Sequence, residues 1–372
     1  MENIEMEKDT VLVIGSGATV GSGVTRDGER LPTDSGFFES PIVYGLLGEQ
    51  GYPLLNIFRE FIPATEHCSL CKTWNALFNL RGLVRAGVVR LDQKIVDTFH
   101  KLGNHEWPQR YIFQQGHYSI PHTLHDYYIV ECAIWELRVL FHDVYDPHHL
   151  KLYGSKYPTF WKGIERHISA VVNMNFDTTF DHGFGAHWYY PGDGVPVDGA
   201  MEIIRPHGSL GWTSLSKGCG SYDDWHWENT YEKTEFDELG FQRKGTTGPF
   251  DFRQAMIVPQ PPGKEEVIGN STVPGLGNQV LRKQWIAFER ALRDSKRWVF
   301  VGFSMASGDD YLELLFRHCV SKETRIACSS YGGDYSLRNR LIETLRDENP
   351  DISCFPIFDS LRAPNLNRWL DE

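Results

Sequence analysis

Three short segments carry the side chains best suited to chemistry, and each follows a run of apolar residues. Asn175 and Asp177 occur in NMNFD, His207 occurs in PHGS, and Ser304 ends GFS. An imidazole exchanges protons near neutral pH, so His207 is a candidate general base, and the amide of Asn175 can orient a water molecule or a hydroxyl group. The structural alternative is that Asn175 and Asp177 form a turn or cap a helix, as both residue types often do.

A glycine-rich stretch near the N-terminus is a candidate phosphate-binding loop. The segment from Val11 to Thr25 reads VLVIGSGATVGSGVT, so a short apolar strand leads into glycines at positions 15, 17, 21 and 23. Glycines allow a tight turn and close approach to a ligand, and the N-terminus of a following helix offers N–H groups to a phosphate. The spacing is not GxGxxG, because three residues separate the second and third glycines. The alternative is a glycine-rich turn without a ligand.

The segment around Ser304 repeats this combination of small and polar residues. Gly302, Phe303 and Ser304 are followed by MASGDD, which contains Asp309. Hydroxyls and a helix N-terminus at this place are suited to hold a ribose or a phosphate, or else they cap the helix.

The elements that would position these residues alternate between strand and helix. Apolar runs predict strands at 11–14, 169–176, 203–204, 255–259, 298–303, 324–330 and 352–358, and amphipathic patterns predict helices at 276–295, 309–320, 335–347 and 360–370. This alternation predicts an α/β fold, a Rossmann-like parallel sheet with helices on both faces. Ligands of such sheets bind at the carboxyl ends of the strands, where all the candidate segments lie.

Residues 41–167 follow a different pattern, that of a mostly helical insertion. Helices are predicted at 41–62, 72–86, 91–102, 123–144 and 157–167. In the fourth, a buried stripe is predicted by the helical spacing of Ile129, Ala133, Leu137 and Leu140. We therefore predict a Rossmann domain of residues 1–40 and 168–372, with an irregular excursion at 213–254, and a helical insertion at 41–167.

The composition is that of a globular protein: of 372 residues, 41% are hydrophobic and 23% charged. A net charge of −12 argues against general binding to nucleic-acid phosphates. No apolar run reaches the roughly 18 residues of a membrane helix, and the first residues, MENIEMEKDT, lack the apolar core of a signal peptide. The seven scattered cysteines favour reduced thiols and a cytoplasmic location.

Taken in order, these segments resemble the motifs of the sirtuin-like superfamily. Sirtuins and their relatives carry a GAGxS-type glycine loop, an Asn-x-Asp signature, a His-Gly pair and a Gly-x-Ser strand end. The counterparts here are GSGATVGSG, Asn175-Phe176-Asp177, His207-Gly208 and Gly302-Phe303-Ser304. The late segment GFSMASGDD makes the match closer to a divergent bacterial branch of sirtuin-like, NAD-consuming proteins, many of them antiviral defence effectors.

The resemblance implies that NAD is bound and cleaved between nicotinamide and ribose. It assigns catalysis to Asn175, which orients water or the ribose hydroxyls, and to His207, which accepts a proton. Asp177 holds the ribose or shapes its loop, and the pyrophosphate lies over residues 15–23. The implied cofactor-binding residues are Gly15, Ser16, Gly17, Ala18, Asp177, Gly302, Ser304 and Asp309. Neither catalytic residue belongs to a predicted apolar face, so we expect the fold to survive their replacement.

Two departures separate the chain from the deacylating sirtuins. Those enzymes place a zinc ribbon of two Cys-x-x-Cys pairs after the His-Gly pair, whereas only Cys219 lies between Gly208 and Val299. Cys68 and Cys71 form the one Cys-x-x-Cys pair, far upstream, so we predict no bound metal. The glycine segment also ends in GVTRDGER rather than a GIPDFR-like sequence, which argues against an acyl-lysine tunnel.

The resulting hypothesis is an NAD glycohydrolase that depletes NAD in antiphage defence when assembly triggers it. No ATPase motif or sensor domain is recognisable in the chain, so we expect a homo-oligomer and a separately encoded partner, such as a HerA-type ATPase. Two alternatives stay open. One is a non-catalytic subunit that senses NAD or ADP-ribose, and the other is a protein deacylase, which the missing zinc ribbon disfavours.

Overall fold

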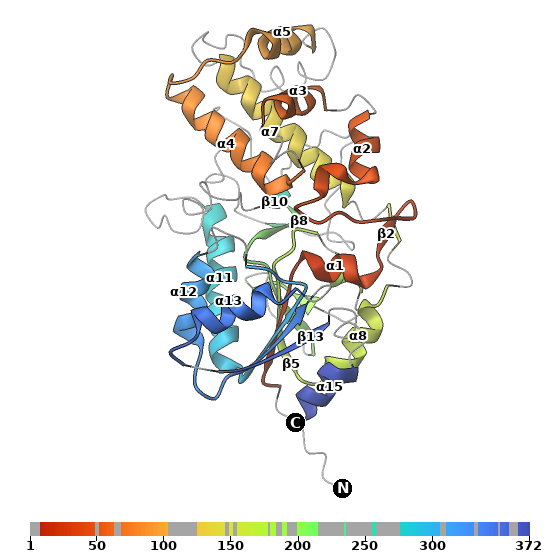
Figure 1. The fold of residues 1–372 in the computed structure, drawn as a ribbon, viewed down its shortest axis with the longest axis vertical. Coiled ribbons are helices and arrows are strands. Elements are labelled where there is room, and N and C mark those ends of the chain that lie inside the picture. Colours follow the sequence, from red (N-terminus) through yellow and green to blue (C-terminus); the bar gives the residue numbers. More distant parts are fainter. Residues whose placement is uncertain are drawn as a thin grey trace.

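A computed structural model gives the fold (Figure 1). It describes residues 8–48, 52–62, 68–102, 125–145, 149–151, 155–177, 179–183, 188–191, 199–214, 234–235, 255–257, 276–305, 310–330, 334–348, 350–356 and 364–372. Asp309 and Cys219, two residues singled out above, lie outside the described residues.

A seven-stranded parallel sheet forms the centre of the fold. Its strands are β1 (Thr10–Ile14), β5 (Ile168–Asn173), β6 (Trp188–Tyr189), β7 (Met201–Ile204), β11 (Arg297–Val301), β12 (Arg325–Ser330) and β13 (Asp351–Pro356). Their order is β13-β12-β11-β1-β5-β7-β6, so β1 pairs with β11 on one side and with β5 on the other. The predicted α/β fold with a parallel sheet is confirmed, with Val11 and Val299 in the same sheet.

The apolar run in β1 is continuous because both faces of the sheet are covered. Leu12 and Ile14 belong to one hydrophobic core, and Val11 and Val13 belong to a second core on the opposite face. Successive side chains of a strand alternate between faces, and all four residues are fully buried.

Helices cover each face of this sheet (Figure 1). The second core includes side chains from α11 (Leu276–Asp294), α12 (Asp310–Cys319) and α13 (Ser336–Thr344). The first core includes side chains from α1 (Ser16–Ser22), α8 (Tyr157–Ile164) and α15 (Pro364–Asp371). Helix α8 also contacts α9 (Thr179–Gly183) and α15. Its buried side chains share the first core with Leu12 and Ile14 of β1, so α8 packs with the sheet.

A group of helices extends from one end of the sheet (Figure 1). It consists of α2 (Pro41–Gly48), α3 (Pro53–Phe61), α4 (Leu70–Arg85), α5 (Gln93–Leu102) and α7 (His125–Val144). Helix α7 contacts the other four, and its predicted stripe is fully buried at Ile129, Ala133, Leu137 and Leu140. The single helix predicted over 41–62 is wrong: a second helix begins at Pro53, whose ring lacks an N–H and is tolerated only in a first turn.

Two small antiparallel sheets complete the described elements. One contains β2 (Thr25–Arg26), β3 (Glu29–Arg30) and β4 (Leu150–Lys151), and the other contains β8 (Gly208–Ser214), β9 (Thr234–Glu235) and β10 (Ala255–Ile257). The predicted excursion at 213–254 falls almost entirely outside the described residues, and β8 continues to Ser214. The division of the chain at 41 and 167 stays a prediction. Of the helices that the structure describes, none combines the length and apolarity needed to span a membrane.

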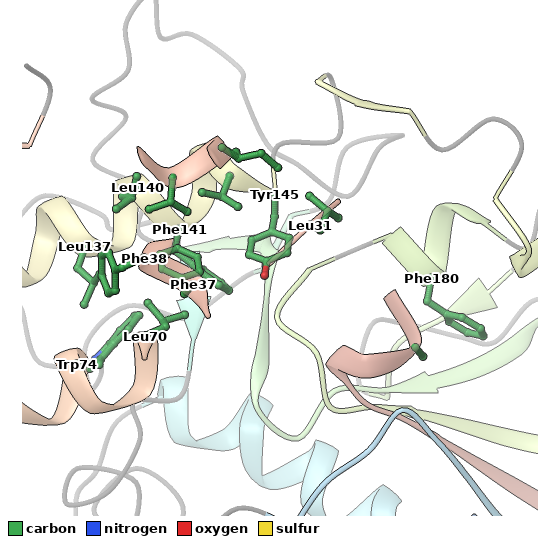
Figure 2. Close-up of a cluster of buried hydrophobic side chains, with 14 of the residues drawn as sticks. Leu31, Phe37, Phe38, Leu70, Trp74, Leu137, Leu140, Phe141, Tyr145 and Phe180 are labelled. Atoms are coloured by element: carbon green, nitrogen blue, oxygen red, sulfur yellow. The ribbon is translucent and has the colours of Figure 1, made fainter. Parts of the chain in front are cut away.

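An aromatic cluster joins the helical group to the sheet (Figure 2). Phe37 and Phe38 come from the short 3-10 helix η1 (Phe37–Glu39). Phe141 lies in the last turn of α7, and Tyr145 directly follows this helix. The ring of Phe141 lies 6.0 Å from that of Phe37 and 4.8 Å from that of Tyr145. The buried hydroxyl of Tyr145 donates to the carbonyl of Pro32 at 2.8 Å, which fixes this end of α7 against the segment after β3.

Candidate active site

The candidate residues meet at one edge of the sheet. Because β1, β5, β7 and β11 are parallel, the segments after their last residues lie at the same edge. These segments contain Gly15, Asn175, His207 and Ser304. From β1 the chain first adds β5 and β7 on one side and later adds β11 and β12 on the other. Ligands of parallel sheets bind in the crevice at such a switch point, here between β1 and β11.

The glycines at the switch point bring two backbone segments into close contact. The amides of Gly15 and Gly17 donate to the carbonyls of Val301 and Gly302, each at 2.9 Å. A Cβ atom on Gly15 would lie 2.4 Å from the carbonyl oxygen of Gly302, and one on Gly302 would lie 1.8 Å from the amide nitrogen of Ala18. Gly302 also has a φ of 60°, which favours glycine.

The structure shows a short helix where an open glycine loop was expected, and phosphate binding there stays a prediction. Helix α1 begins at Ser16, directly after Gly15, so residues 16–22 are helical and not an extended glycine loop. The N–H groups of Gly15 and Gly17 are bonded to carbonyl oxygens at the end of β11. The glycine pattern alone does not distinguish a ligand-binding loop from close backbone packing, because the absence of a Cβ allows both.

The other residues predicted to bind the cofactor differ in exposure. Ala18 is buried, and its amide donates to the carbonyl of Gly15 at 2.9 Å. Ser16 and Ser304 are exposed, one directly after Gly15 and the other two residues after Gly302. Among the described residues predicted to bind the cofactor, these two serines are exposed, and Gly17 and Gly302 are partly exposed.

Asn175 is buried in a polar network that joins the end of β5 to α1. Its exposed fraction is 5%, and its backbone amide donates to Oδ1 of Asn173 at 3.1 Å. Its Nδ2 donates to Oγ1 of Thr19 at 3.2 Å. The same Thr19 hydroxyl contacts polar side-chain atoms of Asp177, Thr179 and Tyr157. One hydroxyl thus organises the loop after β5.

Asp177 takes part in the turn that follows Asn175. Its Oδ1 accepts hydrogen bonds from the backbone amide of Thr179, at 3.0 Å, and from the Thr179 hydroxyl. Burial raises the pKa of the Asp177 carboxyl, while the bonds from Thr179 and the charge of Arg205 lower it. Of the two roles considered for Asp177, these contacts account for shaping the loop. A contact with ribose stays a prediction.

Arg205 is a residue of this edge that the sequence analysis missed. It is fully buried, and its Nε donates to Oδ2 of Asp181 at 2.9 Å while its Nη2 forms an ion pair with the same oxygen. Its Nη1 donates to the carbonyl of Asn175 at 2.9 Å, and its Nη2 to that of Asp177 at 3.0 Å. The available signal was its position, since an arginine placed directly after two buried isoleucines needs partners inside the fold.

His207 lies in a buried aromatic environment. Its exposed fraction is 7%, and its Nε2 lies 3.0 Å from the hydroxyl of Tyr311, near the start of α12. The centroid of its ring is 6.0 Å from that of Phe176 and 6.2 Å from that of Trp285. Which partner donates between His207 and Tyr311 depends on the histidine tautomer. Trp285 and Tyr311 could not be assigned from sequence, because their helices lie far from His207 along the chain.

Phe176 connects the two predicted catalytic residues to the helical group. It stands between Asn175 and Asp177, its ring contacts that of His207, and its ring meets that of Phe141 edge-on at 5.6 Å. Both Asn175 and His207 are therefore buried among other side chains. The sequence predicted that neither residue belongs to an apolar face and that the fold would survive their replacement. Because both side chains are buried, we now expect their replacement to disturb the packing around them.

The described residues contain no group of three or more His, Cys, Asp or Glu side chains arranged to hold a metal ion. Cys68 and Cys71 are both partly buried. Since Cys219 lies outside that part of the chain, the expectation of no bound metal stays a prediction.

No protein-family model matches the chain, and no curated protein matches it. The chain is similar to a structure from a study of the mechanism and regulation of Sir2 enzymes, with a TM-score of 0.39 and 11% identity over 98% of this chain and 93% of that one. A histidine-to-asparagine mutant of a Sir2 homologue with ADP-ribose gives 0.37 and 12%, over 99% and 94% of the two chains. A histidine-to-tyrosine mutant of Sir2 with a p53 peptide and NAD gives 0.34 and 10%, over 98% and 92%. The similarity to Sir2 structures thus covers nearly the whole chain at low TM-score and identity.

Proposed function

We propose that the protein is an NAD glycohydrolase, which hydrolyses NAD to nicotinamide and ADP-ribose. The observation that supports it most is a buried amide, Asn175, and a buried imidazole, His207, at the ends of adjacent parallel strands, with Phe176 in contact with the histidine. Both strand ends are at the same edge as the switch point between β1 and β11. A dinucleotide bound across that crevice would bring one of its ribose groups toward these two side chains.

The reaction exchanges one bond at the ribose. The bond between C1′ and the nicotinamide nitrogen breaks, its electron pair leaves with neutral nicotinamide, and a water oxygen bonds to C1′ as the water loses a proton. In this proposal Asn175 orients the water or the ribose hydroxyls. His207 accepts the proton, from the water or from a ribose hydroxyl, and such base assistance contributes roughly 10²–10⁴-fold to the rate.

The exposed hydroxyls next to the switch point are the proposed contacts to the cofactor. Ser16 and Ser304 flank the close contact between Gly15 and Gly302, and both reach solvent. Gly15 and Gly17 hold the ends of β1 and β11 together, since their N–H groups donate to carbonyls at the end of β11. We also propose that Asp309 binds the cofactor.

An uncontrolled NAD hydrolase would harm the cell that makes it, so we propose that assembly controls its activity. The proposed assembly is a homo-oligomer with a separately encoded partner such as a HerA-type ATPase, acting in antiphage defence. Phe141 of α7 contacts Phe176 edge-on. A partner that shifts α7 would therefore act on the residue between Asn175 and Asp177.

One observation favours a second candidate, a non-catalytic subunit that binds NAD or ADP-ribose. The hydroxyl of Tyr311 lies 3.0 Å from Nε2 of His207. A ring nitrogen engaged in this way does not accept a proton from the substrate until the contact opens.

The deciding experiment is to incubate the purified chain with NAD, alone and with the product of its neighbouring gene, and to separate the products by chromatography. A glycohydrolase releases equal amounts of nicotinamide and ADP-ribose in at least one of the two conditions. Binding of NAD by calorimetry without release in either condition supports the second candidate. Neither binding nor release would contradict both.

A further inference from the structure

We propose that Arg205 is a positioning residue that holds the backbone on both sides of Phe176, and thereby aims the side chain of Asn175. The proposal rests on the proposed function, because it takes Asn175 as the catalytic asparagine. Its structural part, that Arg205 fixes this loop, does not depend on the reaction.

The guanidinium of Arg205 reaches two carbonyls of the same loop. Nη1 donates to the carbonyl of Asn175 at 2.9 Å, and Nη2 donates to that of Asp177 at 3.0 Å. A guanidinium is planar and its donors have a fixed geometry. Two carbonyls bound to one such group keep a fixed separation, so the turn around Phe176 is constrained while Asn175 reaches Thr19.

Arg205 is itself held from several directions. Its Nε and Nη2 bind Oδ2 of Asp181, and that oxygen also accepts a bond from the hydroxyl of Tyr190 at 2.9 Å. Oδ1 of Asp181 accepts Nδ2 of Asn173, at the end of β5, at 2.9 Å. The backbone amide of Arg205 donates to Oε1 of Gln284 in α11, also at 2.9 Å. The guanidinium is thus anchored to elements on either side of the loop that it binds.

The two carbonyl contacts distinguish a positioning role from a stabilising one. A buried ion pair as such is not needed for stability, because replacing both partners by neutral groups of similar size is often neutral or favourable. An ion pair that only stabilised the fold would therefore leave catalysis unchanged when both charges are removed together. If the ion pair positions Asn175, removing both charges lowers the catalytic rate.

The test removes both charges at once. Arg205→Met alone leaves Asp181 buried without its partner and risks unfolding, so the informative variant is Arg205→Met combined with Asp181→Asn. Arg205→Lys keeps the charge and loses the planar fork. The matched control is Arg290→Met in α11, which breaks an ion pair between a partly exposed arginine and Glu202 of β7, the strand that Arg205 directly follows.

With the wild-type chain active on NAD, we expect the double variant to melt cooperatively and to keep KM within about threefold while kcat falls about 10-fold or more. Arg205→Lys should also have a lower kcat than the wild type, and Arg290→Met should have the kcat and KM of the wild type. A folded double variant with wild-type kcat would overturn the proposal.

Hydrogen exchange of the free protein gives a readout besides activity. Amides of residues 173–177 should exchange at least about 10-fold faster in the double variant, while those of β12 stay unchanged. Unchanged exchange at 173–177 would overturn the positioning role even if kcat fell. If the wild-type chain does not cleave NAD under any condition, the proposed function fails, and the exchange measurement still decides whether Arg205 fixes this loop.

Discussion

Nδ2 of Asn175 lies 3.2 Å from Oγ1 of Thr19, so the loop after β5 is hydrogen-bonded to the first helix of the chain. The Thr19 hydroxyl also contacts the carboxyl of Asp177 and the hydroxyl of Tyr157. The side chain proposed to orient water or ribose is therefore held by α1, the helix that begins directly after β1 at its switch point with β11. We therefore predict that substrate binding and the position of Asn175 are coupled through this one threonine.

Replacing Thr19 with Val tests this coupling. The change keeps the shape of the side chain and leaves the Asn175 amide and the Tyr157 hydroxyl without their bonds to it, so unfolding should become easier by about 1–3 kcal/mol. Nicotinamide release should fall as well. Thr98→Val is the control, since the Thr98 hydroxyl donates to the carbonyl of Lys94 within the same helix, α5. Urea unfolding and product release measure the two effects, and a Thr19 variant identical to the control in both would rule out the coupling.

The proposed catalytic pair makes a separate prediction. Asn175→Ala and His207→Ala should each lower nicotinamide turnover by about 10²-fold or more, with a much smaller change in NAD affinity. Because both residues are buried, a loss of about 1 kcal/mol or more in stability should accompany this. Turnover is therefore measured below the melting temperature of each variant. Wild-type turnover in folded His207→Ala would remove the histidine from the mechanism.

The contact between Gly302 and α1 predicts a strong difference between two glycines with positive φ. Gly302→Ala places a Cβ 1.8 Å from the amide nitrogen of Ala18, and this overlap with backbone should cost about 3 kcal/mol or more. Gly23 also has positive φ but would have nothing within 4 Å of an added Cβ, so Gly23→Ala should cost about 1 kcal/mol. Thermal melting of the two variants compares them directly. Equal losses would show that backbone conformation, and not the contact with α1, requires Gly302.

Glu136 in α7 predicts a dependence of stability on pH. Its carboxylate oxygens accept the amides of Leu54 and Leu55 at the start of α3, at 3.3 and 2.6 Å. Burial raises its pKa to about 8 from an ordinary value of 4.5, although these two bonds lower it. Between these values the folded chain keeps a proton that the unfolded chain has released. Its contribution to stability therefore decreases as pH rises through this window and is smallest above it.

Glu136→Gln removes this titration. The melting temperature of the variant should fall less than that of the wild type between about pH 5 and pH 8. Glu165→Gln, at an exposed position, provides the control and should follow the wild type. Parallel curves for wild type and Glu136→Gln would mean that the buried carboxyl does not titrate in this range.

The sheet and most of its helices were predictable because their signals are local. The apolar run of β1 and the buried stripe of α7 depend on residues a few positions apart. The contacts that define the site are not local: Arg205 reaches Asp181 and the carbonyl of Asn175, and Tyr311 reaches His207 from 104 residues away. Glycine spacing also has two physical uses, close backbone packing and ligand approach. At Gly15 and Gly17 the structure shows close packing against the end of β11, which the spacing alone did not predict. Local sequence patterns therefore do not predict contacts between residues that are far apart in the sequence.

The central place of β1 has a consequence for synthesis on the ribosome. The side chains of Asp9 and Arg297, which pair beside the start of β1 and β11, are 288 residues apart. At about 5–20 residues per second, the edge of β1 that faces β11 waits roughly 15–60 s for its neighbour to be made. Gly302 and Ser304 emerge still later, so a growing chain cannot complete the edge where β1 and β11 end before residue 304 has been made. Incomplete chains therefore leave an open strand edge that invites aggregation or chaperone binding, and they lack the full site even when β5 and β7 have already formed.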